Sequence, residues 1–269
     1  ERGDKDSCRI AAGYYRKAAE AFSCEAMTRL AVLYTYGYGV PKDAAQAKFW
    51  SQRALATIER LKPRDAMGYL MRARFWHAAG CTSEALADLN KAIELQPNLP
   101  GARRFRGSEL FKAGDFAKAK VDLKTAQKAD PQDAQLYFLS SLIALAEGNP
   151  TECLQNAQLV FDRAPDPDNT RLYALLYGTI ACRMSHDEKG AQKLIGAANA
   201  RIVRGYWPSP LVSYLSGDIN DAKLEDMAQG QGQLTEAQTI IGLTHALSGN
   251  TNEALPALSW VKQHGDPRF

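Results

Sequence analysis

The chain has 269 residues, of which 45% are hydrophobic and 23% charged, the composition of a globular protein. Its formal net charge of +3 is too small to indicate a nucleic-acid-binding surface, which is usually strongly basic and clustered. No run of about 18 apolar residues is present, so the sequence predicts no membrane-spanning helix. Nucleic-acid binding and membrane insertion are both set aside on these grounds.

The first residue is Glu1 and not Met, which predicts that the chain is a processed product or part of a longer one. Any targeting segment would then be missing from it. The lack of a signal peptide therefore says nothing about the compartment.

The first predicted element is an amphipathic helix over residues 6–22. Apolar residues recur along it at three- and four-residue spacing, as on the buried face of a surface helix. This face is predicted to carry Ala11, Tyr14, Tyr15 and Ala18.

Residues 26–55 predict two helices joined by a tight loop. Gly37 and Gly39 suit the loop because glycine adopts positive φ without steric penalty, and Asp43 is placed to cap the second helix. The segment resembles the Sel-one-like repeat, which implies a helical hairpin of an α-solenoid. The resemblance is carried by Leu30, Leu33, Tyr34, Gly37, Tyr38, Gly39, Val40, Lys42, Asp43, Ala47, Trp50 and Ala54.

The opening helix matches the second half of a preceding copy of this repeat, at an offset of 36 residues. Residues 1–62 are therefore predicted to hold one half and one full Sel-one-like repeat. No Gly/Ser-rich linker separates them from the next repeats, so a continuous superhelix is predicted. The matched pairs are Ala11 with Ala47, Tyr14 with Trp50, and Ala18 with Ala54.

The stretch from residue 66 to residue 165 repeats itself with a period of 34 residues. A fixed period of this length is typical of a helix-turn-helix solenoid. Glycines end the first helices, small residues begin the second helices, and prolines follow them. The recurring sets are Gly80, Gly114 and Gly148; Ala85, Ala119 and Cys153; and Pro97, Pro131 and Pro165.

These residues, together with Leu89/Ala92 and Leu123/Ala126, resemble the tetratricopeptide repeat (TPR) pattern G-x4-A-x3-L-x2-A-x4-P. The third copy is weaker, with Cys153 and Ala157 in place of Ala and Leu. The resemblance implies an all-α fold, a right-handed α-α superhelix, with three repeats over residues 63–167.

Residues 168–203 predict an irregular fourth repeat whose first helix starts at Asp168 or Asn169. Residues 204–234 break the pattern and predict a non-repeat helical insert. Pro208 and Pro210 forbid a regular helix through them, so short helices are expected at 211–215 and 220–229, followed by a turn at 230–233. Residues 235–269 predict a last repeat and a tail.

The C-terminal quarter of the chain resembles NlpI-type bacterial TPR lipoproteins. The resemblance rests on a Trp-Pro-x-Pro break at Trp207 and a Gly-Asp-Ile segment at Gly217, both ahead of a last repeat. It implies an envelope-located adaptor in a bacterium, in the periplasm or elsewhere in the envelope. A cytoplasmic location remains the alternative.

The sequence predicts no catalytic, cofactor-binding or metal site. The four histidines show no i, i+4 pairing and no H-E-x-x-H motif. The G-x-S-x-G and Walker motifs are also lacking, so a non-enzymatic protein without cofactors is predicted.

In the TPR resemblance, the first helices line a concave groove at set positions of each repeat. The resulting groove is apolar with a basic centre that Arg103, Arg104 and Arg106 extend, which favours a peptide carrying acidic groups. The alternative for these three arginines is a solvated charge cluster with no partner. Capture of chaperone tails is disfavoured, because that clamp requires Lys and Asn where this chain has Leu70 and Arg74. The predicted partner-binding residues are Met67, Leu70, Arg74, His77, Arg104, Ser108, Phe111, Lys112, Gln135, Phe138, Leu142 and Leu145.

Of the five cysteines, Cys153 and Cys182 lie at helix ends that neighbour each other in stacked hairpins. A disulfide between them is allowed if their Cα atoms come within about 4.4–6.8 Å. The alternative is that each cysteine is a small buried apolar residue.

The sequence thus predicts a scaffold that binds a protein or peptide segment in its groove. The alternative is a self-associating adaptor that regulates an enzyme complex in the cytoplasm.

Overall fold

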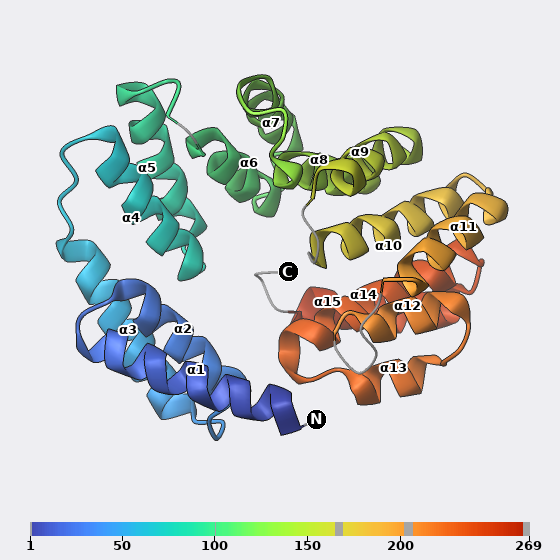
Figure 1. The fold of residues 1–269 in the computed structure, drawn as a ribbon, viewed down its shortest axis with the longest axis horizontal. Coiled ribbons are helices and arrows are strands. Elements are labelled where there is room, and N and C mark those ends of the chain that lie inside the picture. Colours follow the sequence, from blue (N-terminus) through green and yellow to red (C-terminus); the bar gives the residue numbers. More distant parts are fainter. Residues whose placement is uncertain (1, 100, 165–168, 202–206, 266–269) are drawn as a thin grey trace. The chain divides into compact units, whose positions relative to one another are not determined.

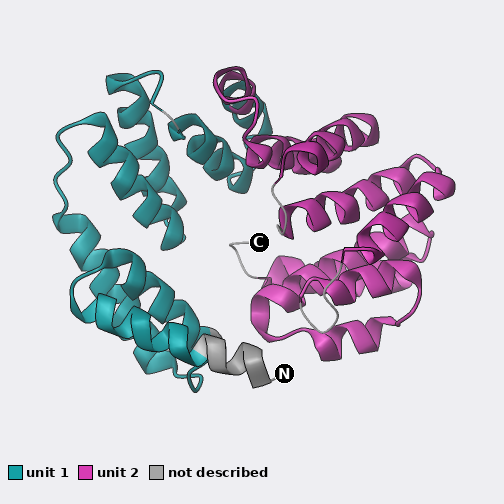
Figure 2. Cartoon of the chain, in the orientation of Figure 1, with its two compact units in different colours: residues 1–122 teal, residues 123–269 magenta. Residues whose placement is uncertain are grey.

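The computed structural model describes residues 2–99, 101–164, 169–201 and 207–265. Within these ranges it contains fifteen α-helices and no strands, which confirms the predicted all-α solenoid class (Figure 1). The chain divides into two compact units, residues 1–122 and residues 123–269 (Figure 2). We call them unit 1 and unit 2 and describe each by itself.

Unit 1 consists of consecutive helices joined by short turns. Neighbours in sequence pack against each other, most extensively α2 with α3 and α4 with α5. Helix α7 begins in unit 1 and ends in unit 2. The helices are α1 (Arg2–Glu20), α2 (Cys24–Tyr36), α3 (Ala44–Arg60), α4 (Ala66–Ala78), α5 (Thr82–Leu95), α6 (Ala102–Lys112) and α7 (Phe116–Ala129).

The repeat glycines end the first helices as predicted. Gly80, Gly114 and Gly148 have φ of +75°, +76° and +72°. A Cβ atom built on any of them would meet no atom within 4 Å, so the backbone conformation and not lack of space requires glycine here. The residue after each glycine donates its N–H to the carbonyl five residues earlier, for example Cys81 to Trp76, which closes the helix end.

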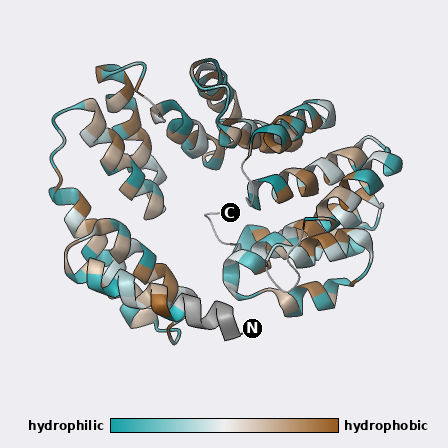
Figure 3. Ribbon diagram, viewed as in Figure 1, coloured by the Kyte–Doolittle hydropathy of each residue, from teal (hydrophilic) through white to brown (hydrophobic). Residues whose placement is uncertain are grey.

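The small repeat residues are fully buried where the two helices of a hairpin meet. Ala85, Ala119 and Cys153 each have 0% exposure. Figure 3 shows apolar residues recurring along the helices instead of gathering in one block. This distribution is expected of a repeat protein, in which each hairpin buries its apolar faces against its neighbours.

The predicted buried face of the first helix is confirmed for Tyr15 and Ala18, which pack against the core, but it is wrong for Tyr14. Ala12 and Ala19 are buried, whereas Tyr14 is 70% exposed. These alanines lie seven residues apart, so they share one face of α1. The predicted cap of α3 is confirmed, since Asp43 Oδ1 accepts from the N–H groups of Ala45 and Gln46 at 2.9 and 3.0 Å.

Unit 2 continues with hairpins and then departs from them. Its largest apolar core joins α10, α11, α12, α13, α14 and α15, with Leu176, Ile180, Leu211 and Leu224 each no more than 2% exposed. The insert therefore supplies core residues and is not a loose connection. The helices are α8 (Ala134–Ala146), α9 (Pro150–Arg163), α10 (Asn169–Met184), α11 (Glu188–Asn199), α12 (Ser209–Ser216), α13 (Asp221–Met227), α14 (Gly230–Leu247) and α15 (Thr251–His264).

Two details of the insert differ from the prediction. Helix α12 begins at Ser209 and includes Pro210, because the first turn of a helix needs no N–H donor there. Residues 230–233 do not form a reverse turn. They are the first helical turn of α14, which starts five residues before the predicted repeat. Asp168, one of the predicted starts of α10, lies outside the described residues.

None of the described helices combines the length and apolar character needed to span a membrane.

Candidate functional site

The first candidate surface lies in unit 1, where α4 and α6 meet. The Phe105 ring contacts two guanidinium groups, with the Arg74 carbon 5.5 Å and the Arg104 carbon 4.8 Å from its centroid. His77 packs its ring edge-on against Phe105, with 5.9 Å between centroids. The quadrupole of an aromatic ring attracts cations over its face, so Phe105 organises both arginines.

A buried carboxylate lies beside them. Glu109 has a side chain only 1% exposed, and its Oε1 contacts His77 Nδ1 and, at 3.6 Å, Lys112 Nζ. Burial by itself would raise the pKa of Glu109, but the hydrogen bond with His77 and the charge of Lys112 outweigh it, so the pKa is lowered. We call Arg74, His77, Arg104, Phe105, Glu109 and Lys112 the basic cluster.

The structure thus brings together four residues predicted from the sequence, namely Arg74, His77, Arg104 and Lys112. It adds Phe105 and Glu109, which are not among the residues predicted from the repeat pattern. A signal for Glu109 existed, because it lies 34 residues after Phe75 and 34 before Ile143. A carboxylate at a register position that is otherwise apolar indicates a polar contact in the core.

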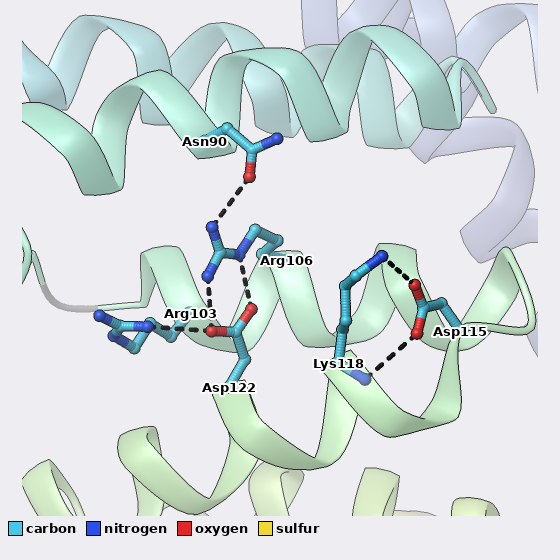
Figure 4. A network of polar contacts seen from close by, with 6 residues as sticks. All are labelled: Asn90, Arg103, Arg106, Asp115, Lys118 and Asp122. Carbon is cyan, nitrogen blue, oxygen red and sulfur yellow. Dashed lines mark hydrogen bonds and ion pairs between the residues drawn. The ribbon is translucent and has the colours of Figure 1, made fainter.

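Arg103 and Arg106 do not extend this cluster in the way the sequence indicates. Both bind the buried Asp122 of α7, as Figure 4 shows. Arg106 donates from Nε at 2.6 Å and from Nη2 at 2.8 Å, and Arg103 donates from Nη1 at 3.0 Å. Their charges are used within the fold.

Other predicted residues of unit 1 have different surroundings. Leu70 is 5% exposed and packs in the core with Ala66 and Ala73, so it cannot line an open groove. Phe111 stacks on Phe116 with 5.7 Å between ring centroids. Met67 is 51% exposed and Ser108 is half-buried.

The second candidate surface lies in unit 2, on α8 and α10. The Phe138 ring packs against Tyr173 and Tyr177 at centroid distances of 6.5 and 6.1 Å. Gln135 of α8 donates to Thr170 Oγ1 of α10 at 2.9 Å. Of the other predicted residues, Leu142 is half-buried and Leu145 packs against the core.

Glu236 of α14 joins this aromatic group. Its Oε2 accepts hydrogen bonds from Tyr173 Oη and Trp207 Nε1, both at 2.7 Å. Burial raises the pKa of Glu236, and the two donors only partly offset this. We call Phe138, Tyr173, Tyr177, Trp207 and Glu236 the aromatic cluster.

No periodic signal could have revealed the aromatic cluster. Glu236 lies 63 residues after Tyr173 and 29 after Trp207 along the chain. Neither separation is a multiple of the 34-residue repeat length. The contact arises because the insert returns the chain so that α14 packs against α10. Only Phe138 was predicted from its repeat position.

In this structure Cys153 and Cys182 are free thiols, and both are buried. Burial, with a smaller contribution from Cys182, raises the pKa of Cys153 to about 12, so the thiol is unreactive. Cys24 is likewise buried and free. The Cys153–Cys182 disulfide stays a prediction, and the Cys8 side chain lies outside the described part.

No three His, Cys, Asp or Glu side chains gather in a metal-binding group within the described ranges. The two clusters instead offer recognition chemistry. Guanidinium groups stacked on an aromatic ring keep the fork geometry that matches a carboxylate. The aromatic cluster offers partly buried rings of the kind that anchor apolar side chains at interfaces.

Comparison with known proteins agrees with the repeat pattern. The sequence model of the tetratricopeptide repeat family matches residues 106–168. DnaJ homolog subfamily C member 3 of Rattus norvegicus is 37% identical over 85 residues, 32% of this chain. Bacteriophage adsorption protein A of Escherichia coli K12 is 26% identical over 191 residues, 69% of this chain. The heat shock protein sti1 homolog of Schizosaccharomyces pombe is 28% identical over 108 residues, 38% of this chain.

These matches cover a small part of each relative. They span 17% of the rat protein and 18% of each of the other two. The chain therefore spans less than a fifth of the length of each of these relatives. The resemblance of the C-terminal quarter to NlpI-type lipoproteins stays a prediction.

Proposed function

Because the chain is a tetratricopeptide-repeat protein, and such repeats bind proteins or peptides, we propose that it is a non-enzymatic scaffold whose basic cluster captures an acidic segment of a partner. Arg74 and Arg104 would pair with carboxylates of that segment, and Lys112 would add a further positive charge.

The observation that carries this proposal is the contact of Phe105 with both guanidinium groups. Stacking fixes the two side chains before a partner arrives, so less rotamer entropy is lost on binding. Glu109 and His77 hold Lys112 at the edge of the same surface. Arg103 and Arg106 are excluded as the main contacts, since Asp122 binds both.

The aromatic cluster of unit 2 provides a second surface of different character. Its rings would receive apolar or aromatic side chains of the same partner or of another one. Large aromatic residues carry much of the binding free energy at protein interfaces. Glu236 would fix Tyr173 and Trp207 in position through its two hydrogen bonds.

The proposal is tested with a labelled library of ten-residue peptides rich in Asp and Glu, and a matched library carrying Asn and Gln. Fluorescence anisotropy should show binding of the acidic peptides and a loss of roughly tenfold or more in the R74E/R104E variant. The control K48E/R60E makes the same charge change at exposed positions of α3 and should bind normally. Equal binding of the amide library would refute the proposal.

A specific observation favours self-association as a second function. Four large apolar side chains of α1, α3 and the turn after α1 are exposed, although such residues are usually buried. Sedimentation equilibrium at high concentration tests this, and a purely monomeric protein would count against it. The residues are Ile10 at 57%, Tyr14 at 70%, Phe22 at 68% and Phe49 at 49% exposure.

We further propose an envelope location, with the cytoplasm as the alternative. The C-terminal resemblance to NlpI-type lipoproteins supports it, as does the similarity to a protein whose name refers to bacteriophage adsorption, a process at the cell surface. Fractionation of cells that express the protein from its complete coding sequence tests the location. Recovery of the protein in the cytosolic fraction alone would contradict it.

A further inference from the structure

A cavity of about 630 Å³ lies in unit 2, and none of its lining residues belongs to the basic cluster or the aromatic cluster. The insert forms one side of it through α12, α13 and the turn between them, and α10, α11 and α14, with the turns that follow α10 and α14, supply the rest. Its volume falls in the range of about 300–1,000 Å³ that is usual for small-ligand sites. No residue predicted from the repeat pattern to bind a partner lines it.

The charged groups of the cavity wall are compensated within the protein. Asp221 accepts from Tyr214 Oη at 2.9 Å and pairs with His245 Nε2 at 2.7 Å. Arg183 donates to the Leu215 carbonyl at 3.0 Å and pairs with Glu188 at 3.5 Å. A charged ligand would have to compete with these partners.

The groups that remain for a ligand are neutral. Gln192 uses its amide nitrogen on Glu188 and retains its carbonyl oxygen as an acceptor. Asn220 uses its side-chain oxygen as the cap of α13, so its amide nitrogen remains a donor. Leu215, Ile219 and Leu247 add apolar surface beside them.

Thr244 of α14 gives a second indication of a ligand. It lines the cavity, and its hydroxyl is buried without a hydrogen-bond partner among the described residues. Such a group costs free energy unless a partner arrives. A helical threonine populates two χ1 rotamers, so the hydroxyl can turn toward an occupant of the cavity.

We propose that this cavity binds a neutral, hydroxyl-rich ligand, a mono- or disaccharide. Each sugar hydroxyl both donates and accepts, which matches the mixture of amide and hydroxyl groups on the wall. The apolar faces of a sugar ring fit against Ile219 and Leu247. The site is independent of peptide capture by unit 1.

The test uses the full chain and the neutral probes glucose, maltose, cellobiose and N,N′-diacetylchitobiose at millimolar concentration, followed by saturation-transfer NMR. At least one should bind, and it should bind roughly fivefold more weakly to T244V. The control T239V makes the same change in α14 at a hydroxyl that donates to Thr235 and does not line the cavity. The affinity of T239V for the sugar should equal that of the wild type.

Two further comparisons sharpen the test. The exposed Gln192 allows a second variant, Q192A, which should also weaken binding without affecting the core. Glucuronate and glucosamine should bind more weakly than glucose, whereas R74E/R104E should bind the sugars normally. The proposal is overturned if no neutral sugar binds, if T244V and T239V bind alike, or if the charged sugars bind best.

Discussion

Arg106 of α6 and Asp122 of α7 form a doubly hydrogen-bonded ion pair that recurs 34 residues earlier as Arg72 with Asp88. The aspartate side chains are 2% and 6% exposed, so each hairpin holds a buried carboxylate against its first helix. In the next repeat these positions carry Ser140 and Asn156, and no charge pair is formed there.

The Asp122→Ala variant should lose about 3–5 kcal/mol of unfolding free energy, because it leaves Arg103 and Arg106 partly buried without their carboxylate. Urea unfolding followed by circular dichroism measures this. The control Lys118→Ala breaks the exposed Lys118–Asp115 pair, also drawn in Figure 4, and should leave stability nearly unchanged. Similar losses in the two variants would contradict the assignment.

Replacing the turn glycine Gly114 by Ala should destabilise the protein by about 1–2 kcal/mol, since a side chain is strained at positive φ even where space is open. Gly196 offers a matched comparison in the interior of α11, with open space and no positive φ. Gly196→Ala should stabilise by about 0.5–1 kcal/mol. Thermal unfolding of the two variants measures both changes in stability. A stability change of the same sign in both variants would contradict positive φ as the reason for glycine at position 114.

The free energy of unfolding of the Glu236→Gln variant should increase relative to that of the wild type as pH rises. The raised pKa of Glu236 means that the folded state binds more protons than the unfolded state, whose glutamate pKa is about 4.3. Wild-type stability therefore falls as pH rises from there through the folded pKa. Glutamine keeps an oxygen for Tyr173 and Trp207 and does not ionise. Urea unfolding across a pH series should show the two proteins converging on acidification.

Glu109→Gln should behave in the opposite way. The lowered pKa of Glu109 means that its carboxylate contributes stability above the unfolded value of about 4.3, and that this contribution is lost as pH falls through the folded pKa. The variant should be less stable than the wild type at neutral pH and equally stable in strong acid. The same pH series measures it, and a gap that widens on acidification would be evidence against the His77–Glu109–Lys112 arrangement.

The repeat positions could be predicted because each has one local cause. Gly114 needs positive φ, and Ala119 needs to be small where two helices touch, so period and residue type together reveal both. The sequence could not show that Leu70 is buried, because groove and core positions of a first helix lie side by side. Nor could it show that Asp122 binds Arg103 and Arg106, since other carboxylates of the chain could equally have been predicted to pair with these arginines.

The insert was harder to predict for a different reason. Its helices pack on α10 and α14, so their ends depend on contacts far along the chain. Pro210 predicts a break in the helix, yet it occupies the first turn of α12, where proline is tolerated. The cavity lined by Tyr214, Asp221 and Thr244 exists only once these elements have folded together.

In the proposed function, the charges of Arg74 and Arg104 select an acidic partner. A charge-swap experiment measures this selection. An acidic peptide that binds the wild type is resynthesised with Lys at its Asp and Glu positions, and both peptides are titrated against wild type and R74E/R104E. We predict that the variant binds the lysine peptide more tightly than the acidic one, the reverse of the wild type. If both proteins prefer the same peptide, Arg74 and Arg104 do not select the partner by charge.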